Sequence, residues 1–264
     1  MNIETIQSLS SMKIDMDKIY TLQEKYWELI DMIDAKRKPD DERTKKEGLS
    51  RLVEDRMYKY AFRLAEEYKL KKEEDIRKMF YETIQDIFDY SWSLVEKKWE
   101  VTQEEIHVLH TKLFPKWLWG TTIWPKWEKF KKLYPMWEYR KERDFTKYKW
   151  WEHDYPDFNN IPELVDIIND FLYNEDYKLH ILIRIILYCA YIVWVHPFYN
   201  GNGTTYIIVL SILLVKNWYD IPKGLLGYIK TITPDILINA RHNLDYEPLI
   251  RGFLELFPCE STKN

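Results

Sequence analysis

The chain has 264 residues, of which 46% are hydrophobic, 16% aromatic and 31% charged. This composition is typical of a folded protein with a substantial core, and it excludes a largely disordered chain. The 39 Lys and Arg residues against 43 Asp and Glu residues give a formal net charge of −4, so the chain as a whole is not suited to holding a polyanion, and we expect no nucleic-acid partner.

The number of cysteines and the length of the apolar runs indicate the cellular compartment in which the protein is expected. The two cysteines, Cys189 and Cys259, indicate neither a disulfide framework nor a cysteine zinc site. The first twenty residues lack the basic start and apolar stretch of a secretory signal. The longest apolar run, residues 181–195, contains Arg184 and is shorter than the ~20 residues that span a bilayer. We expect a protein of the cytoplasm, or one delivered into another cell's cytoplasm, without a membrane partner.

Residues 1–100 are predicted to form an N-terminal helical segment, because apolar residues recur at spacings of three and four. The stretch at residues 34–48, DAKRKPDDERTKKEG, interrupts this pattern. Its proline, closing glycine and dense charge predict a solvated connector.

The main domain is expected over residues 101–258, with a flexible tail at 259–264. Thr102 and Glu105 have the spacing of a capping box, which predicts a helix over about 103–114. From there to residue 158 the periodicity is poor, and eight of the twelve tryptophans lie between Trp99 and Trp151. We expect long loops with a small β-hairpin. These aromatics among lysines could stack on bases or anchor a protein-docking surface, and the net charge favours docking.

Ordered structure is expected to resume at Asn160, a predicted helix cap that is followed by Pro162 in the first turn. Two strongly apolar segments, 179–195 and 206–215, predict a pair of buried helices. Thr233 begins another helix, and a last helix is predicted over about 248–257. The predicted fold class is all-α, or mostly α.

The linker between the two apolar segments, HPFYNGNGTTY, contains two of only seven glycines. Gly201 and Gly203 flank Asn202, and Thr204 and Thr205 follow at the start of a buried helix. Free N–H groups and the helix dipole favour an anion there, and the glycines allow positive φ and close approach of a ligand. Phosphate is the expected ligand.

His196 directly precedes this loop. Histidine ordinarily titrates at about pH 6.5, which suits proton transfer, so His196 is a candidate general base. Alternatively the loop is only a tight turn and His196 a hydrogen-bonded core histidine, because a short glycine loop alone is a weak signal.

The motif resembles the signature of the Fic (Fido) family, His-x-Phe-x-Asp/Glu-Gly-Asn-Gly/Lys-Arg-x-x-Arg, at His196, Phe198, Gly201, Asn202 and Gly203. The resemblance extends over residues 102–257. EEIHVLHTKLF, with His110, is similar to the first family helix, YRKERDFTKYKWW to the arginine-bearing segment before a flap, and YCAYIVWVHPF to the long helix that ends in the motif.

The resemblance implies a nucleotidyltransferase of the AMPylation type. It would move AMP, or another phosphate-containing group, from a nucleoside triphosphate, with ATP as the leading donor, to a Ser, Thr or Tyr hydroxyl of a protein target. His196 would deprotonate that hydroxyl, a flap near residues 148–158 would align the target, and Pro197 and Phe198 would support the motif. The phosphate-binding residues would be Gly201, Asn202, Gly203, Thr204 and Thr205.

Three charged positions depart from the family pattern. Asn200 stands where the family has an acid that holds Mg²⁺, and Thr204 and Ile207 stand where it has arginines. An amide is a weaker Mg²⁺ ligand than a carboxylate, so Asn200 is a weak metal ligand and the use of Mg²⁺ stays open. The alternative function is therefore a catalytically impaired Fic-fold protein that acts as an interaction module.

The connector also offers a partial match to the family's inhibitory pattern, Ser/Thr-x-x-x-Glu-Gly/Asn. Glu47 and Gly48 fit, but Arg43 occupies the Ser/Thr position and Ile207 would leave the glutamate without its arginine. We favour a solvated charged linker.

Overall fold

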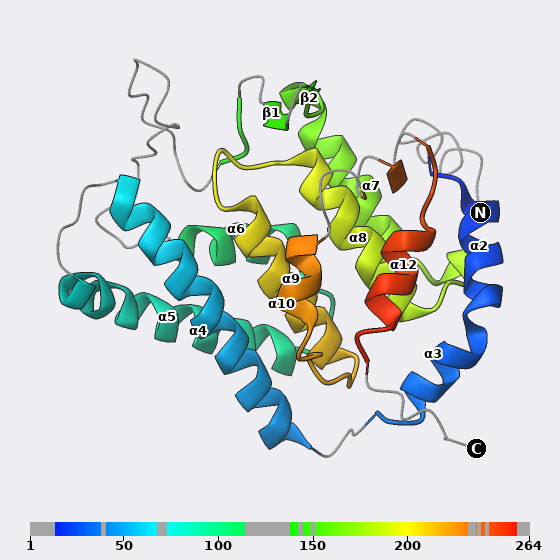
Figure 1. The fold of residues 1–264 in the computed structure, drawn as a ribbon, viewed down its shortest axis with the longest axis horizontal. Coiled ribbons are helices and arrows are strands. Elements are labelled where there is room, and N and C mark those ends of the chain that lie inside the picture. Colours follow the sequence, from blue (N-terminus) through cyan, green and yellow to red (C-terminus); the bar gives the residue numbers. More distant parts are fainter. Residues whose placement is uncertain are drawn as a thin grey trace.

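The computed structural model describes residues 14–37, 41–67, 73–113, 138–141, 145–148, 151–231, 236, 239–240 and 243–257. The fold is mostly α, as predicted (Figure 1). The α-helices of the described residues are α2 Met16–Lys25, α3 Trp27–Asp34, α4 Glu42–Glu67, α5 Glu73–Glu96, α6 Gln103–Lys112, α7 Ile161–Tyr173, α8 Ile181–Val195, α9 Asn202–Lys216, α10 Leu225–Thr231 and α12 Glu247–Leu254. Short 3-10 turns at Phe158–Asn160 (η2) and Glu175–Tyr177 (η3) flank α7.

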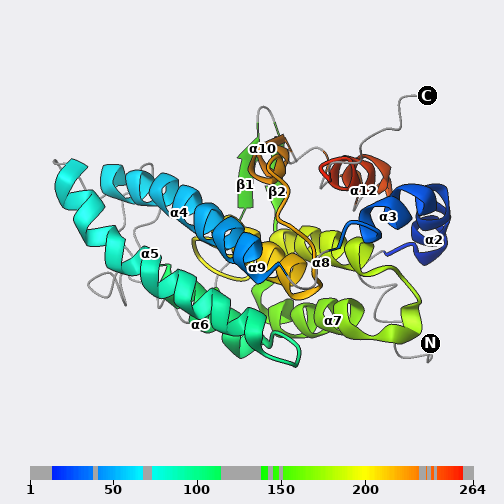
Figure 2. The same ribbon diagram turned by 90° about the horizontal axis from the view of Figure 1, so that it is seen from below.

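Helix α9 lies at the centre of the fold. It is apolar on all sides, and every residue from 204 to 215 is buried, as a helix without a polar face requires. Helices α4, α5, α6 and α8 pack against it, and α8 packs in turn against α7 and α12. Figure 2 shows α4 and α5 side by side on one flank, with α7 along α8 on the other. The two apolar segments are thus buried helices, as predicted.

The charged connector is shorter than expected, because the chain is helical from Glu42 onward rather than from Gly48. Lys, Glu and Arg are good helix formers in a solvated stretch. Asp41 accepts a hydrogen bond from the Thr44 amide at 3.1 Å, and Arg43 pairs with Glu47 at 3.0 Å one turn later. The prediction of a connector over 34–48 was wrong for its second half, since charge density alone does not separate a linker from an exposed helix.

The predicted capping box is confirmed at α6, where Thr102 and Glu105 bond reciprocally to each other's backbone. Helix α7 begins where predicted, with Asn160 at the N-cap position and Pro162 in the first turn, but the Asn160 side chain makes no capping bond. Asp157 instead accepts from the Asn159 amide at 2.8 Å and caps the preceding turn η2. The helix start predicted at Thr233 lies outside the described residues.

Strands β1 (Phe145–Tyr148) and β2 (Trp151–Asp154) pair antiparallel, with Tyr148 opposite Trp151. They lie in the segment where the sequence favoured a hairpin. Residues 114–137, which carry most of the tryptophan cluster, lie outside the described part of the chain, so the docking prediction for that cluster stays a prediction.

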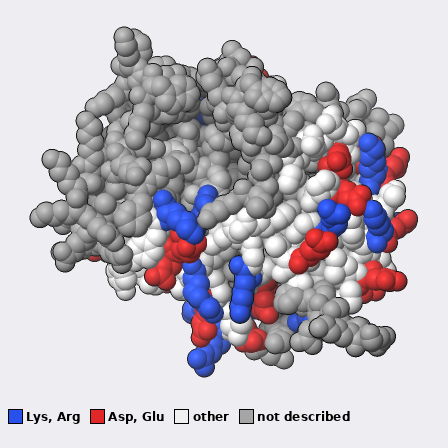
Figure 3. All heavy atoms as spheres, viewed as in Figure 1, with Lys and Arg blue, Asp and Glu red and all other residues white. Residues whose placement is uncertain are grey.

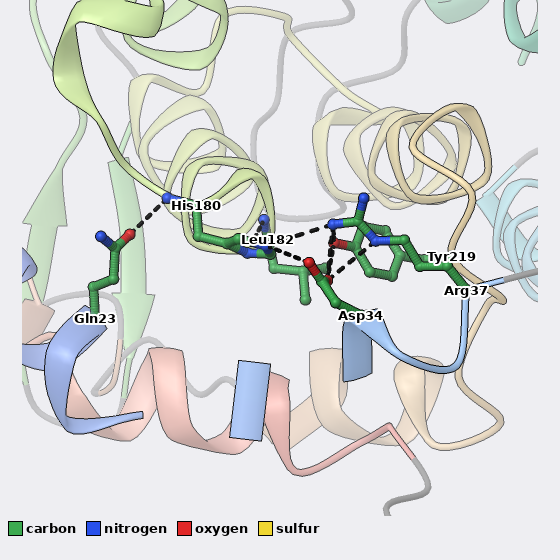
Figure 4. A network of polar contacts seen from close by, with 6 residues as sticks. All are labelled: Gln23, Asp34, Arg37, His180, Leu182 and Tyr219. Carbon is green, nitrogen blue, oxygen red and sulfur yellow. Dashed lines mark hydrogen bonds and ion pairs between the residues drawn. The ribbon is translucent and has the colours of Figure 1, made fainter. Parts of the chain in front are cut away.

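A polar network fastens α2 and α3 to the start of α8 (Figure 4). Asp34 accepts from Tyr219 Oη at 2.7 Å and from Arg37 Nη2 at 2.8 Å, and it lies 3.2 Å from His180 Nε2. The His180 ring also caps α8, because its Nδ1 accepts from the Leu182 amide at 3.3 Å. The N-terminal segment is therefore tied to the helix that leads to the glycine loop.

Among the helices of the described residues, none combines the length and the apolarity needed to cross a membrane. On the face drawn in Figure 3, basic and acidic side chains of the described residues lie next to one another. Along α4 they form ion pairs such as Asp55 with Lys59, so this part of the surface has no extended single-sign patch.

Candidate functional site

The turn between α8 and α9 depends on two residues in left-handed backbone conformations. His196 ends α8 with a φ of 49°, and Gly201 stands at the N-terminus of α9 with a φ of 79°. Gly201 satisfies the predicted need for positive φ, because a residue without Cβ adopts this conformation at little cost. Gly203 is instead in the first helical turn and is exposed, so its role is to leave the backbone accessible.

Asn202 closes the loop through its buried side chain. Its Oδ1 accepts from the Phe198 amide at 2.9 Å, and its Nδ2 donates to the Phe198 carbonyl at 2.7 Å. Thr205 is similarly engaged, since its hydroxyl donates to the Gly201 carbonyl at 3.0 Å. These two side chains, predicted to bind phosphate, are bonded to the loop itself. At these two residues a phosphate would therefore be contacted by backbone N–H groups rather than by the side chains.

His110 of α6 contacts the loop through Phe198 and Asn200. Its ring stacks on Phe198 with 3.8 Å between ring centroids, and its Nε2 lies 2.7 Å from the Asn200 carbonyl oxygen. Phe198 is fully buried, which agrees with the predicted supporting role of this motif position. The stacked pair fixes the loop from the side opposite to solvent.

Arg140 fixes the residues that precede the loop. Its side chain is only 1% exposed, and its Nε donates to the His196 carbonyl at 2.8 Å. Its Nη2 donates to the carbonyls of Pro156 and Val195 at 2.5 and 3.3 Å, and its backbone amide donates to the Pro197 carbonyl at 2.8 Å. The sequence placed an arginine in this segment, but only the structure shows that it is buried against the end of α8.

The His196 ring has a stacked neighbour. Tyr155, which follows β2, lies parallel to it with 4.1 Å between ring centroids and 7° between planes. The ring is thus held in one orientation at the edge of the glycine loop, which is what a positioned general base requires.

A pocket of about 150 Å³ opens beside this ring. Most of the predicted site residues line this pocket, whereas Pro197, Phe198 and Thr205 do not. Arg56 of α4 was not predicted, because no short-range pattern links it to the motif. The pocket is lined by Arg56, His196, Tyr199, Asn200, Gly201, Asn202, Gly203 and Thr204.

The lining residues do not form a protein site for Mg²⁺. None of them is acidic, and Asn200 Oδ1 accepts a hydrogen bond from the Gly201 amide at 2.7 Å. In the portion of the chain that the structure describes, no cluster of His, Cys, Asp and Glu side chains could hold a metal ion. Hard cations prefer anionic oxygen ligands, so we derive no step through a metal bound by these residues.

Glu47 does not reach the pocket. It pairs with Arg43 at 3.0 Å and with Arg51 at 3.9 Å, and its side chain is 52% exposed. The stretch is part of helix α4 rather than the charged linker that the sequence favoured. Glu47 is paired on the outer surface of that helix, which gives no support to an inhibitory contact with the pocket.

The fold and the site together define a helical protein with a glycine loop between two buried helices and a histidine at the edge of that loop. The Fic/DOC family model matches residues 100–214. That segment contains His196 and the whole glycine loop, so the family model matches the same part of the chain that carries the resemblance in the sequence.

Solved structures of this family are among those similar to the chain. A Fic family protein from Desulfovibrio desulfuricans G20 aligns with a TM-score of 0.49 and 15% identity over 97% of this chain and 72% of its own. BepC, a VirB-translocated effector protein from Bartonella tribocorum whose structure contains AMPPNP, aligns with a TM-score of 0.47 and 13% identity over 74% of this chain and 91% of its own. No curated protein matches the chain.

Proposed function

We propose that this protein transfers a nucleoside monophosphate, or another phosphate-containing group, from a nucleoside triphosphate to a hydroxyl group of a target protein. One observation carries the proposal: the His196 ring and the first turn of α9 line the same pocket. A base and an anion site are the two parts that transfer of a phosphoryl-type group to a hydroxyl requires. ATP is the first donor to test.

The reaction begins with the donor phosphates against the start of α9. Among the described residues, the amides of Asn202, Gly203 and Thr204 have no backbone acceptor, and Gly201 has no side chain to cap them. These N–H groups and the helix dipole stabilise negative charge. A drug-sized ligand fills roughly 300–1,000 Å³, so the pocket of about 150 Å³ accounts for the phosphates and not for the base and sugar.

The proton of the target hydroxyl then moves to a ring nitrogen of His196. The hydroxyl oxygen forms a bond to the α-phosphorus of the donor, and the bond from that phosphorus to the leaving pyrophosphate breaks. His196 later returns its proton to the leaving group or to water. Charge that develops on the transferring group would be stabilised by the amides of the first turn of α9, whose residues Asn202, Gly203 and Thr204 line the pocket.

The test is mass spectrometry of the intact full-length protein, and of a cell lysate, after incubation with ATP, GTP, CTP or UTP. We expect a covalent adduct of one nucleoside monophosphate, or of phosphate, on a protein hydroxyl, and we expect His196→Ala to abolish it. If the folded protein and its lysate give no adduct with any of the four nucleotides, the proposal fails.

A second candidate function has its own observation. Ile207, at the position of the second family arginine, is 4% exposed and packed in the core, so that part of the family site has been replaced by apolar packing. This favours a protein-interaction module that kept the fold. A partner whose binding survives His196→Ala, in the absence of any adduct, would identify that function.

A further inference from the structure

Arg56 occupies the inner face of α4. It falls on the same helical stripe as Leu49, Leu52 and Val53, all of which are buried. Helix α4 packs along α9, and Arg56 on this stripe lies beside Gly203, in the first turn of α9. Arg56 itself is half-buried and lines the pocket together with His196.

The guanidinium group lies against the first turn of α9. A Cβ atom placed on Gly203 would be 3.6 Å from Arg56 Nη2. The neighbouring position, Thr204, is the one at which the family motif has its first arginine. The motif has therefore lost a cation at residue 204, while a guanidinium from a distant helix stands one residue away.

Three other basic side chains of α4 lie on its outer surface, where Arg43, Arg51 and Lys59 are 90%, 74% and 46% exposed. Lys45 is buried, but it lies over the Trp218 ring, 4.6 Å from the ring centroid, and does not line the pocket. Arg56 is next to a pocket whose lining contains no acidic side chain. A planar guanidinium donates two parallel hydrogen bonds to phosphate oxygens, and these bonds are stronger away from bulk water.

We propose that Arg56 binds the phosphate groups of the donor and so replaces the missing motif arginine. This inference deepens the proposed function and rests on it for the identity of the ligand, a polyphosphate. Arg56 lies outside residues 100–214, the segment that matches the Fic/DOC family. The N-terminal helical segment would thus complete the binding site rather than only cover it.

The test measures binding without chemistry. Isothermal titration of the full-length protein with inorganic pyrophosphate, and with ATP in the absence of Mg²⁺, is compared for the wild type, Arg56→Gln, Arg56→Lys and Lys59→Gln. Arg56→Gln keeps most of the side-chain stem and removes the charge. Lys59→Gln removes the same charge from the exposed face of the same helix and is the matched control.

We expect Arg56→Gln to weaken pyrophosphate binding about tenfold or more, the scale of one lost charge-assisted hydrogen bond. Arg56→Lys should bind with intermediate affinity, because an ammonium group keeps the charge but not the planar pair of donors. Lys59→Gln should stay within about twofold of the wild type. Equal losses in Arg56→Gln and Lys59→Gln, or a wild type that does not bind pyrophosphate, would overturn the inference.

Chemical modification tests the same contact if Arg56→Gln does not fold. The wild-type protein is treated with phenylglyoxal, which modifies arginine, with and without pyrophosphate, and the modified sites are identified by mass spectrometry. Pyrophosphate should protect Arg56 and leave the exposed Arg51 unprotected. Equal modification of Arg56 in both samples contradicts the inference.

The inference and the proposed function can fail separately. Pyrophosphate binding that depends on Arg56, without an adduct from any nucleotide, would support the phosphate contact and reject the transferase. An adduct that forms equally well in wild type and Arg56→Gln, with unchanged pyrophosphate affinity, would support the transferase and reject the role of Arg56.

Discussion

The Nε atom of Arg140 donates a 2.8 Å hydrogen bond to the carbonyl oxygen of His196. The last carbonyls of a helix have no intrahelical donor. At the end of α8 the buried guanidinium of Arg140 supplies donors to two of them, the carbonyls of His196 and Val195. A third bond, to Pro156, ties in the segment that leads to α7. The position of the candidate base therefore depends on a residue outside the motif.

Arg140→Ala should destabilise the fold. Removing the guanidinium leaves the buried Val195 carbonyl and the half-buried carbonyls of His196 and Pro156 without these donors, and we expect a loss of about 2–4 kcal/mol in the free energy of unfolding. The thermal midpoint should fall by roughly 5–15 °C. Circular dichroism melts of Arg140→Ala and of the exposed control Arg51→Ala provide the measurement. A midpoint for Arg140→Ala that matches the control would show that the clamp is not important for stability.

The backbone conformation at His196 predicts that glycine is a less destabilising substitution there than alanine. A left-handed φ of 49° is strained for any residue with a Cβ, so His196→Gly should be more stable than His196→Ala by about 0.5–1 kcal/mol, after the greater freedom of glycine in the unfolded chain is counted. Both variants lose the stacking with Tyr155, so their difference isolates the backbone. Urea denaturation gives the two free energies, and the reverse order would contradict the observed conformation.

Much of the fold is readable from the sequence because it depends on local patterns. Thr102 and Glu105 satisfy each other within one turn, and α9 must be buried because it has no polar face. The start of α4 could not be read in the same way. A run of charged residues is compatible with a solvated linker and with an exposed helix, and only the Asp41 cap and the packing of Leu49 and Val53 on α9 decide between them.

The candidate site also contains residues that the sequence shows and residues that only the structure shows. The motif shows His196 and the glycine loop because these residues are adjacent in the chain. Arg140 and Arg56 are missed because their roles arise from contacts with residues far away in the sequence. The sequence also does not show which polar side chains of the loop face a ligand, since Asn202 and Thr205 are hydrogen-bonded to the backbone of Phe198 and of Gly201.

Acid should weaken the attachment of the N-terminal segment at His180. Burial lowers the pKa of His180, and the nearby Asp34 offsets this only in part. The folded protein therefore binds this proton more weakly than the unfolded chain does, so the stability from neutral His180 is present above about pH 6.5 and is lost as the pH falls below it. The pKa of Asp34 is lowered although burial alone would raise it, because hydrogen bonds from Tyr219 and His180 prevail. Asp34 thus titrates at more acidic pH.

Urea denaturation at pH 7.5 and 5.5 tests this prediction. His180→Asn keeps a side chain that can cap α8 and removes the titrating ring, so its unfolding midpoint should fall less between the two pH values than that of the wild type. A pH dependence identical in both proteins would place the acid sensitivity at other residues.

Restoring the family's charged groups tests how the pocket was altered. Asn200→Asp can keep the existing bond from the Gly201 amide and adds a carboxylate, the ligand type that Mg²⁺ prefers. Thr204→Arg returns the first motif arginine to a residue that already lines the pocket. Thr204 and Ile207 are both only 4% exposed, but Ile207 does not line the pocket. Ile207→Arg is therefore left out, because its charge would be buried in the core without a partner.

The order in which these changes are combined matters, because an arginine at residue 204 would lie near the guanidinium of Arg56. Two like charges in one small pocket repel each other, so Asn200→Asp with Thr204→Arg should gain more when Arg56→Gln is also present. We expect this triple variant to recover the pyrophosphate affinity that Arg56→Gln loses, by roughly 1.5–3 kcal/mol for one charge-assisted contact. Its affinity for ATP should also rise with added Mg²⁺, whereas that of the wild type should not. Isothermal titration with and without MgCl₂, together with transfer from labelled ATP, measures both effects. A folded triple variant that binds no better than Arg56→Gln would mean that Arg56 and the motif arginine are not interchangeable, because the phosphates then approach α9 along a different path.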